Sequence, residues 1–303
     1  MSPLLLKRYE VKPKLKEDIS ALPFLLPFTI LYFIFTLFPV FQGIFISFHR
    51  WSLMGKIRFV GLQNYVKLFH DPFFYSSFKN TLIFVLLSTP TMIITSLSFA
   101  LLANRKTKVK KFLRTAYYMP CVLSVSVISY ITIFMAQPYM GFINGLLHSL
   151  KLIPLDTELF LLTDPGKVWG TIIVATIWWT VGFNMMLYIS ALQDIPEQVY
   201  EAANIDGANE VQKFFRITLP QLAPITKLLV MLQIIASFKV FSQIFLITKG
   251  GPGNTTRPLI QYIYATGFQR NHMGYSAAIS YILFIILLVL GIIQIKINKY
   301  SKA

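Results

Sequence analysis

Six apolar segments, each long enough to cross a lipid bilayer, constrain this sequence more than any other feature. An α-helix rises ~1.5 Å per residue and the hydrocarbon core of a membrane is ~30 Å thick, so about 20 mainly apolar residues can span it. Of the whole chain, 55% is hydrophobic and only 13% is charged, which leaves too little polar surface for a soluble domain. The sequence therefore predicts an integral membrane protein whose spans are residues 22–48, 80–103, 115–136, 168–193, 222–247 and 274–296.

The expected fold class is all-α, a polytopic membrane protein with about six transmembrane helices. Lipid cannot satisfy exposed backbone N–H and C=O groups, so open sheet edges are excluded from the membrane. The segments also contain prolines that indicate kinked helices packed as a bundle: Pro27, Pro39, Pro90 and Pro120. We expect one transmembrane domain over residues 22–296, with short tails at 1–21 and 297–303.

Basic residues outside the spans predict the orientation. The N-terminal tail holds Lys7, Arg8, Lys12, Lys14 and Lys16. The connection between the second and third spans holds Arg105, Lys106, Lys108, Lys110, Lys111 and Arg114, without a single acid. Because Lys and Arg accumulate on the cytoplasmic side of membrane proteins, we expect both segments there, and an even number of spans returns the C-terminus to the same side. The first external loop is an exception to this bias, since it contains Arg50, Lys56, Arg58 and Lys67.

The net charge of +16 does not indicate a nucleic-acid partner. The cations lie in short segments between apolar runs, which is typical of charge beside a lipid bilayer. Cys121 is the only cysteine, and the four histidines are scattered without the close spacing of a metal-binding helix. We therefore expect no metal site, and no grouping of nucleophile, base and acid suggests a catalytic residue.

The source of energy for any transport is also constrained. All twelve Asp and Glu residues fall outside the six spans, whereas ion-coupled carriers usually hold a carboxylate at membrane depth. No stretch matches the phosphate-binding pattern G-x-x-x-x-G-K-[ST], and the glycines at 250, 251 and 253 are interpreted as a tight turn. Energy from ATP would have to enter through another subunit.

Five of the twelve acids lie between the fourth and fifth spans, in residues 194–220, a segment that topology places in the cytoplasm. Pro196 and Glu197 favour a helix start, because proline loses no needed hydrogen bond there and a carboxylate favours the positive end of the helix dipole. Gly207 permits a backbone that breaks the helix. A second short helix with an apolar side then runs to Pro220, so the segment is predicted to be a helix-turn-helix at the membrane surface.

The spacing within this segment resembles that of a known family. Residues 201–220 fit the pattern E-A-A-x3-G-x9-I-x-L-P, the signature loop of ABC importer permeases. The order of F-P-V-F-Q-G-I-F-I-S-F, F-V-G-L-Q-N-Y, the pair Asn80-Thr81, F-L-R-T-A-Y-Y-M-P and I-T-K-G-G-P-G-N-T-T is similar to the sugar-importer branch. Within it, the chain is most similar to the larger maltose permease subunits, without their extra external domain.

The resemblance implies a permease subunit in the bacterial inner membrane that conducts a sugar or oligosaccharide. The implied partners are a second homologous permease, two ABC ATPase subunits that bind ATP and Mg, and an external solute-binding protein. The residues implied to couple to an ATPase are Glu201, Ala202, Ala203, Asp206, Gly207, Leu219 and Pro220. The residues implied to line the substrate pathway are Trp178, Trp179, Thr180, Phe183, Gln233, Ser237 and Lys239.

Three alternatives stay open at this stage. A glycerol-phosphate or other polyol-phosphate cargo is compatible with the same branch, because Lys239 or Arg257 could pair with phosphate. An ion-coupled secondary carrier is opposed by the absence of carboxylates from the spans. A scaffold or membrane-embedded enzyme is opposed by the absence of a catalytic grouping.

Overall fold

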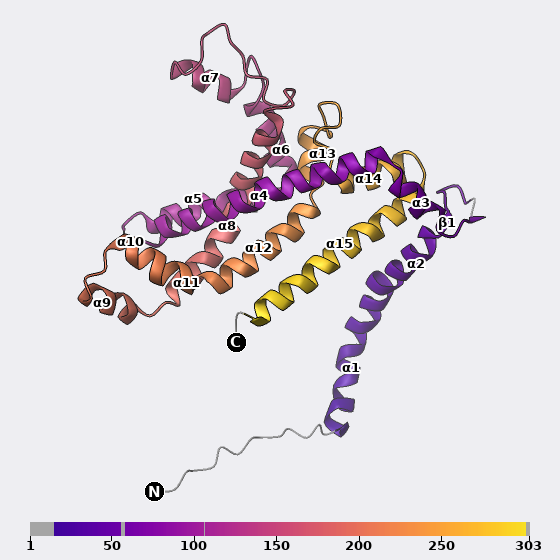
Figure 1. Cartoon of the computed structure of the whole chain (residues 1–303), viewed down its shortest axis with the longest axis horizontal. Coiled ribbons are helices and arrows are strands. Elements are labelled where there is room, and N and C mark those ends of the chain that lie inside the picture. Colours follow the sequence, from indigo (N-terminus) through magenta and orange to yellow (C-terminus); the bar gives the residue numbers. More distant parts are fainter. Residues whose placement is uncertain (1–14, 56–57, 106, 301–303) are drawn as a thin grey trace.

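The computed structural model describes the backbone of residues 15–55, 58–105 and 107–300, and the side chains of residues 24–55, 58–105 and 107–296. Helices make up most of this part of the chain, and its one sheet pairs two short strands. Figure 1 shows long helices side by side in a bundle, with the N-terminal helices leaning away from it. The predicted all-α fold class is confirmed. The five cations of the N-terminal tail used to predict the orientation, together with Lys56 and Lys106, lie outside the described side chains.

The first membrane segment is a helix interrupted by one wide turn. Its parts are α1 (Leu15–Tyr32), the π-helical turn η1 (Phe33–Leu37) and α2 (Phe38–Ser47). The wide turn precedes Pro39, whose ring would clash with a carbonyl one turn earlier in a regular helix. Helix α1 begins inside the segment expected to be a tail. Its large apolar side chains are exposed in this chain, Phe24 by 86%, so lipid or another subunit must cover them.

A short ribbon and a short helix follow the first segment. Strand β1 (His49–Arg50) pairs antiparallel with β2 (Arg58–Phe59), and α3 (Gln63–Phe69) leads to the next long helix. The amide of Met273 donates to the carbonyl of Trp51 at 3.1 Å, which joins this region to the start of the last helix.

Helix α4 (Pro72–Asn104) is longer than the span expected over 80–103. Asp71 caps its N-terminus by accepting a 2.9 Å hydrogen bond from the amide of Phe73, and Pro72 occupies the first turn. Both residue types favour a helix start, which the apolar count alone does not detect. The extra two turns place Asp71 against α14 (Leu259–Tyr264) and α15 (Met273–Tyr300), whose Tyr262 and Tyr275 donate to its carboxylate.

The third segment departs from the single span expected over 115–136. It consists of α5 (Lys110–Val122) and α6 (Val125–Met135), whose axes differ by 101°. Pro120 cannot donate a helical hydrogen bond, Leu123 is extended, and the Ser124 hydroxyl caps the new helix at the amide of Val127. The sequence therefore turns sharply within the apolar run. Beyond it, α7 (Phe142–Ser149) lies in a long loop that projects from the bundle (Figure 1).

Helix α8 (Val168–Gln193) spans the same residues as the fourth expected segment and lies in the centre of the bundle. Its buried residues pack against α4 and α12 in a cluster that includes Ala100, Met185, Tyr188, Leu222 and Leu229. The Tyr188 hydroxyl donates to Thr226 Oγ1 at 3.1 Å, so its polar end is satisfied inside this apolar region.

The fifth expected span, 222–247, is also broken. It contains α12 (Ala223–Phe238) and α13 (Ser242–Ile247), separated at residues 239–241. The chain before it forms α9 (Glu197–Ile205), α10 (Glu210–Lys213), η2 (Phe214–Thr218) and α11 (Leu219–Gln221). The chain after it forms α14 (Leu259–Tyr264), η3 (Ala265–Gln269) and α15 (Met273–Tyr300), which contains the last expected span, 274–296.

The described residues include four helices that are long and apolar enough to cross a membrane. They cover Phe24–Ser47, Pro72–Asn104, Val168–Gln193 and Met273–Lys296. Two bent pairs, α5 with α6 and the α10–α11 run with α12, pass the same test together, which raises the number to six. The number of spans is therefore four to six, and it reaches the expected six when each bent pair is one span.

Candidate functional site

The segment between α8 and α12 is a helical hairpin at one end of the bundle (Figure 1). Helix α9 begins after Pro196 and ends at Ile205, and Gly207, two residues later, has φ +75°. A side chain is strained in that conformation, so glycine is the residue that suits the turn. Both features agree with what Pro196 and Gly207 predicted for this segment.

Side-chain hydrogen bonds join the two arms of this hairpin. Asn209 and Gln212 exchange hydrogen bonds of 2.8 and 2.9 Å with each other's backbone, which forms a capping box at the start of α10. Lys213 Nζ donates to Asn204 Oδ1 at 2.8 Å. The hydroxyls of Tyr200 and Thr218 lie 2.9 Å apart. These contacts let the hairpin move as one body rather than as a loose loop.

The seven residues implied to couple to an ATPase do not share one environment. Glu201, Ala202, Asp206 and Gly207 are exposed near the tip of the hairpin, and Pro220 is exposed at the start of α11. Ala203 is only 8% exposed, because its methyl group is covered by this chain. The small side chain that another protein could approach is therefore that of Ala202, whereas Ala203 packs inside. Leu219 is half-buried.

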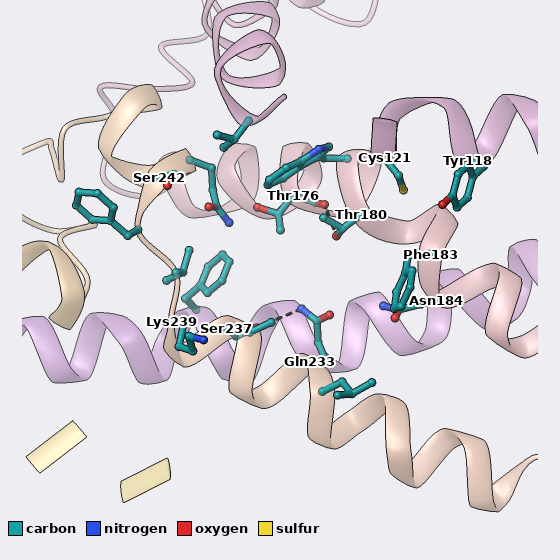
Figure 2. A pocket seen from close by; sticks show the side chains of 18 residues that line it. Tyr118, Cys121, Thr176, Thr180, Phe183, Asn184, Gln233, Ser237, Lys239 and Ser242 are labelled. Carbon is teal, nitrogen blue, oxygen red and sulfur yellow. Dashed lines mark hydrogen bonds between the residues drawn. The ribbon is translucent and has the colours of Figure 1, made fainter. Parts of the chain in front are cut away.

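A cavity of about 520 Å³ lies between α4, α5, α8, α12 and α13. Figure 2 shows side chains from these elements around it, with Tyr118 and Cys121 on α5 and Thr176, Thr180, Phe183 and Asn184 on α8. Six of the seven residues implied to line a substrate pathway border this one cavity: Trp179, Thr180, Phe183, Gln233, Ser237 and Lys239. Their positions in the sequence are up to 60 residues apart, so the fold brings them together (239 − 179 = 60).

Trp178 is the residue of that set that does not border the cavity. It lines a separate apolar groove between α6, α7 and α8, with Met135, Ile143 and Val174. Successive residues of a helix point about 100° apart, so Trp178 and Trp179 cannot both face the same space. The indole N–H of Trp179 donates to the carbonyl of Leu123 at 3.1 Å, where it holds the bend between α5 and α6.

Hydrogen-bonding groups are arranged in a chain on the α12 side of the cavity. Gln233 Nε2 donates to Ser237 Oγ at 3.2 Å (Figure 2). Ser237 Oγ in turn lies 3.0 Å from Ser88 Oγ on α4. Across the cavity, the Thr180 hydroxyl donates to the carbonyl of Thr176 at 2.8 Å and keeps its lone pairs for a ligand. Aromatic faces beside amides and hydroxyls suit a sugar ring, which has both C–H patches and hydroxyls.

Lys239 lies at the break between α12 and α13. It caps the C-terminus of α12, where its amide donates to the carbonyls of Ile235 and Ala236 at 3.2 Å. A cation suits the negative end of a helix dipole. Its side chain borders the cavity, and among the described residues that line the cavity it is the one formal charge. The cavity therefore carries a positive potential and no lining carboxylate.

Several lining residues escaped the sequence analysis. Thr176 and Asn184 flank Thr180 at intervals of four on α8, so the three polar side chains share one face of the helix. That spacing could have identified them. Tyr118 and Cys121 could not be assigned from spacing, because they face the cavity only through the packing of α5 on α8. Among the described residues, no three His, Cys, Asp or Glu side chains are grouped closely enough to hold a metal ion.

Comparison with known proteins gives one consistent family. Residues 69–299 match the family described as the binding-protein-dependent transport system inner membrane component. The chain is 35% identical over 282 residues to a probable ABC transporter permease of Bacillus subtilis, YurN, covering 92% of this chain and 96% of that protein. It is 32% identical over 288 residues to the arabinooligosaccharides transport system permease AraP of Bacillus subtilis, covering 93% and 90%. The multiple sugar-binding transport system permease MsmF of Streptococcus mutans is 36% identical over 277 residues, with 91% and 94% covered.

Solved structures of bacterial ABC transporters have the same fold as this chain. A chain of a bacterial ABC transporter involved in the import of the acidic polysaccharide alginate superposes with a TM-score of 0.81 at 26% identity, covering 95% of this chain and 96% of that one. A second structure of a bacterial alginate ABC transporter, in complex with an alginate pentasaccharide-bound periplasmic protein, gives a TM-score of 0.80, with 92% and 94% covered.

Proposed function

This chain belongs to the family of binding-protein-dependent transport system inner membrane components, and from that membership we propose that it is the permease subunit of an ATP-driven sugar importer. It is a transporter subunit rather than an enzyme. Relatives named for arabinooligosaccharide and multiple-sugar transport support a carbohydrate as the cargo. The single observation that carries the proposal is the acidic hairpin of α9–α11, which exposes Glu201, Ala202, Asp206 and Gly207 near its tip.

The proposed orientation puts this hairpin and both termini in the cytoplasm. The basic connection between α4 and α5 lies at the same end of the bundle as the hairpin, which supports this orientation (Figure 1). The opposite end, which carries β1, α3 and the turn before α14, then faces outward. We call these the inner and outer ends of the bundle.

Coupling would use the hairpin as a lever. Exposed Glu201 and Asp206 offer carboxylates to cations on an ATPase subunit, and Ala202 allows close approach of its backbone. The bonds from Lys213 and Tyr200 transmit the movement to η2 and α11, and so to α12 and the cavity wall. ATP and Mg would bind to two ABC ATPase subunits.

The pathway would form between this chain and a second, homologous permease. An external solute-binding protein would deliver the sugar at the outer end. Trp179, Phe183 and Gln233 would contact the cargo through ring faces and an amide, while Ser237 and Thr180 supply hydroxyls. Opening and closing of this cavity would follow the hairpin, because α12 both continues from α11 and borders the cavity.

The substitution Gly207→Pro tests the proposal. Proline holds φ near −65°, whereas Gly207 has φ +75° and its amide donates to Asn204 at 3.1 Å, so the tip must change shape. In the assembled transporter we expect ATP-driven uptake to fall at least tenfold, an order-of-magnitude estimate, and the ATPase to co-purify poorly.

Gly55→Pro is a matched control at the outer end. Gly55 has φ +80°, and its amide donates to Ser52 at 3.1 Å. Proline at this position therefore forces the same change of φ and removes the same kind of hydrogen bond as at Gly207. This control should retain ATPase binding. If Gly207→Pro retains full uptake and a full complement of ATPase, the hairpin is not the coupling element and the proposed function loses its main support.

A further inference from the structure

The outer end of the bundle is strongly basic, against the usual distribution of charge in membrane proteins. Between residues 49 and 70, and again between 248 and 275, the sequence contains no acid. Four exposed cations and one half-buried cation of these stretches lie at the outer end, beside the imidazole of His272. We call these residues the outer basic patch: Arg50, Arg58, Lys67, Arg257, Arg270 and His272.

Hydrogen bonds hold the segments of the patch in one place. The amide of Leu53 donates to Asn271 Oδ1 at 2.7 Å, which fixes the β1–β2 loop beside the residues before α15. Asn64 Nδ2 donates to the carbonyls of Ser47 and His49 at 2.8 and 3.0 Å, which fixes α3 against β1. The Lys67 ammonium lies 4.8 Å from the centre of the Tyr275 ring.

The charges of the patch are close enough to affect one another. Burial first, and then the neighbouring Lys67, Arg50 and Arg270, lower the pKa of His272 below its usual value. Burial and then Arg270 lower the pKa of the Arg257 guanidinium. Arg50 and Arg58 are direct partners in the two-stranded ribbon, and like charges opposite each other destabilise such a pair. Repulsion among the cations of the patch therefore destabilises the fold. This cost indicates that the patch serves an interaction with another molecule.

The acid at the boundary of the patch, Asp71, is bound by neutral donors of this chain. Asp71 Oδ2 accepts hydrogen bonds from the hydroxyls of Tyr262 and Tyr275, and Oδ1 accepts from the amide of Phe73. Its lone pairs are directed to this cap and to the two tyrosines. Among the described residues, no ion pair between the patch and an acid is present.

We propose that the outer basic patch binds an acidic surface of the external solute-binding protein. This inference rests on the proposed function, which requires such a protein at the outer end. Charged groups around an interface accelerate encounter and fix orientation, and they do so through a field that salt screens. The patch would hold the binding protein in the orientation that releases sugar toward the cavity.

A protein suits this patch better than lipid headgroups do. Anionic lipid needs only mobile cations that reach the surface, whereas here four hydrogen bonds between separate segments hold the cations in a set arrangement. A set arrangement of charge is useful against a partner with its own fixed charges.

The double substitution Arg58→Gln with Arg270→Gln tests the proposal in the assembled transporter, held in discs of neutral lipid. The probe is the transporter's own purified external binding protein, titrated at NaCl concentrations from about 50 to about 300 mM. Wild-type affinity should fall as salt rises. The variant should bind about tenfold more weakly at low salt, with a shallower dependence on salt.

Two controls separate charge from folding. Lys110→Gln with Lys111→Gln removes the same charge from exposed residues of α5 at the inner end, and should leave binding unchanged. Arg58→Lys with Arg270→Lys keeps the charge and should retain the salt dependence. Since Arg58→Gln relieves the repulsion with Arg50, the thermal midpoint of the variant should not fall.

The outcomes distinguish failure of this inference from failure of the proposed function. Wild-type binding that ignores salt, or a Gln variant that binds like wild type, overturns this inference while the proposed function stands. If the Gln variant binds more weakly than wild type only when anionic lipid is added, the patch binds lipid, and this inference is again overturned. A wild-type complex that binds no external protein at any salt overturns the proposed function and this inference with it.

Discussion

Asn80 and Asn254 are 174 residues apart in the sequence, yet Asn80 Nδ2 donates a 2.9 Å hydrogen bond to the backbone oxygen of Asn254. The same amide donates to the carbonyl of Arg257 at 3.1 Å. Next to it, Thr81 Oγ1 accepts from the amide of Leu259 at 2.9 Å. Two short motifs that resemble the sugar-importer branch, Asn80-Thr81 and the glycine-rich turn after α13, are thus one structural unit at the outer end.

Asn80→Ala should destabilise this unit. Asn80 is 6% exposed, and loss of its amide removes the donor to the carbonyl of Arg257 and leaves the carbonyl of Asn254 with only the longer 3.3 Å bond from the Arg257 amide. An unsatisfied buried group costs about 1–3 kcal/mol, so the thermal midpoint of the purified transporter should fall by several degrees, an order-of-magnitude expectation. Thr81→Val should also lower the thermal midpoint, whereas Thr81→Ser keeps the hydroxyl acceptor and should lower the midpoint less. An unchanged midpoint for Asn80→Ala would show that the turn is held by other contacts.

Asp71 should make stability depend on pH in the acid range. Burial raises the pKa of its carboxyl, but hydrogen bonds from Tyr262, Tyr275 and the amides of Phe73 and Phe74 outweigh burial and lower the pKa overall. The charged form is therefore favoured in the fold. Its contribution is complete above the unfolded value of about 3.9 and is lost as pH falls through the lower folded value.

The measurement is the thermal midpoint of wild type and Asp71→Asn between about pH 6 and pH 3. The asparagine variant should be less stable near neutral pH, and the difference should shrink below about pH 4 as the native carboxyl takes up a proton. Parallel curves over the whole range would mean that Asp71 does not titrate with folding.

Local chemistry predicted the parts of this structure whose cause is local. Pro196 and Gly207 marked the start and the break of the hairpin, and the fourth span coincides with α8 because its apolar run has no internal cap or proline. The bend between α5 and α6 could have been found from Pro120 followed by Ser124, but hydropathy averages over such signals. The early start of α4 at Asp71 was missed for the same reason.

The site was only partly predictable. Spacing along α8 could have added Thr176 and Asn184 to the cavity and removed Trp178, since these are properties of one helix. The union of Asn80 with the turn at 250–254, and the gathering of cations at the outer end, depend on contacts between distant segments. Nothing in the spacing of a single sequence encodes those contacts.

Gly182 should be sensitive to the smallest substitution. An added Cβ would lie 2.5 Å from the carbonyl oxygen of Tyr117 and 2.7 Å from Cα of Tyr118, both of them backbone atoms of α5. Gly182→Ala must therefore push α5 away from α8 and distort the cavity that both helices border. Overpacking of this kind costs about 1–3 kcal/mol. The expected result is a lower thermal midpoint together with reduced uptake.

Gly170→Ala provides the control on the same helix. An added Cβ at Gly170 meets nothing within 4 Å, so the substitution should be neutral or slightly stabilising. Equal effects of the two substitutions would mean that the contact between α5 and α8 does not limit stability.

Lys239 should report the chemistry of the cargo. The Lys239 ammonium is charged, so its hydrogen bond to a neutral hydroxyl contributes about 1.5 kcal/mol, the lower end of the range for bonds with one charged member. Removing one partner of a buried, hydrogen-bonded pair in which both groups are charged costs about 2–5 kcal/mol. With tenfold for each 1.4 kcal/mol, Lys239→Met should weaken transport of a neutral sugar about tenfold, and transport of a cargo bearing a carboxylate or phosphate by roughly 30-fold or more. Uptake kinetics at several cargo concentrations measure the difference.

The size of the effect therefore separates a neutral sugar from a polyol phosphate, the alternative that Lys239 left open. Lys239→Arg keeps the charge and should retain most of the transport, because residue 239 is exposed in this chain and leaves room for the larger guanidinium. Lys249→Met is the matched control, since it removes an exposed lysine from the outer turn, away from the cavity. Wild-type transport of every cargo by Lys239→Met would contradict a role for this lysine in the pathway and leave its position at the end of α12 as its function.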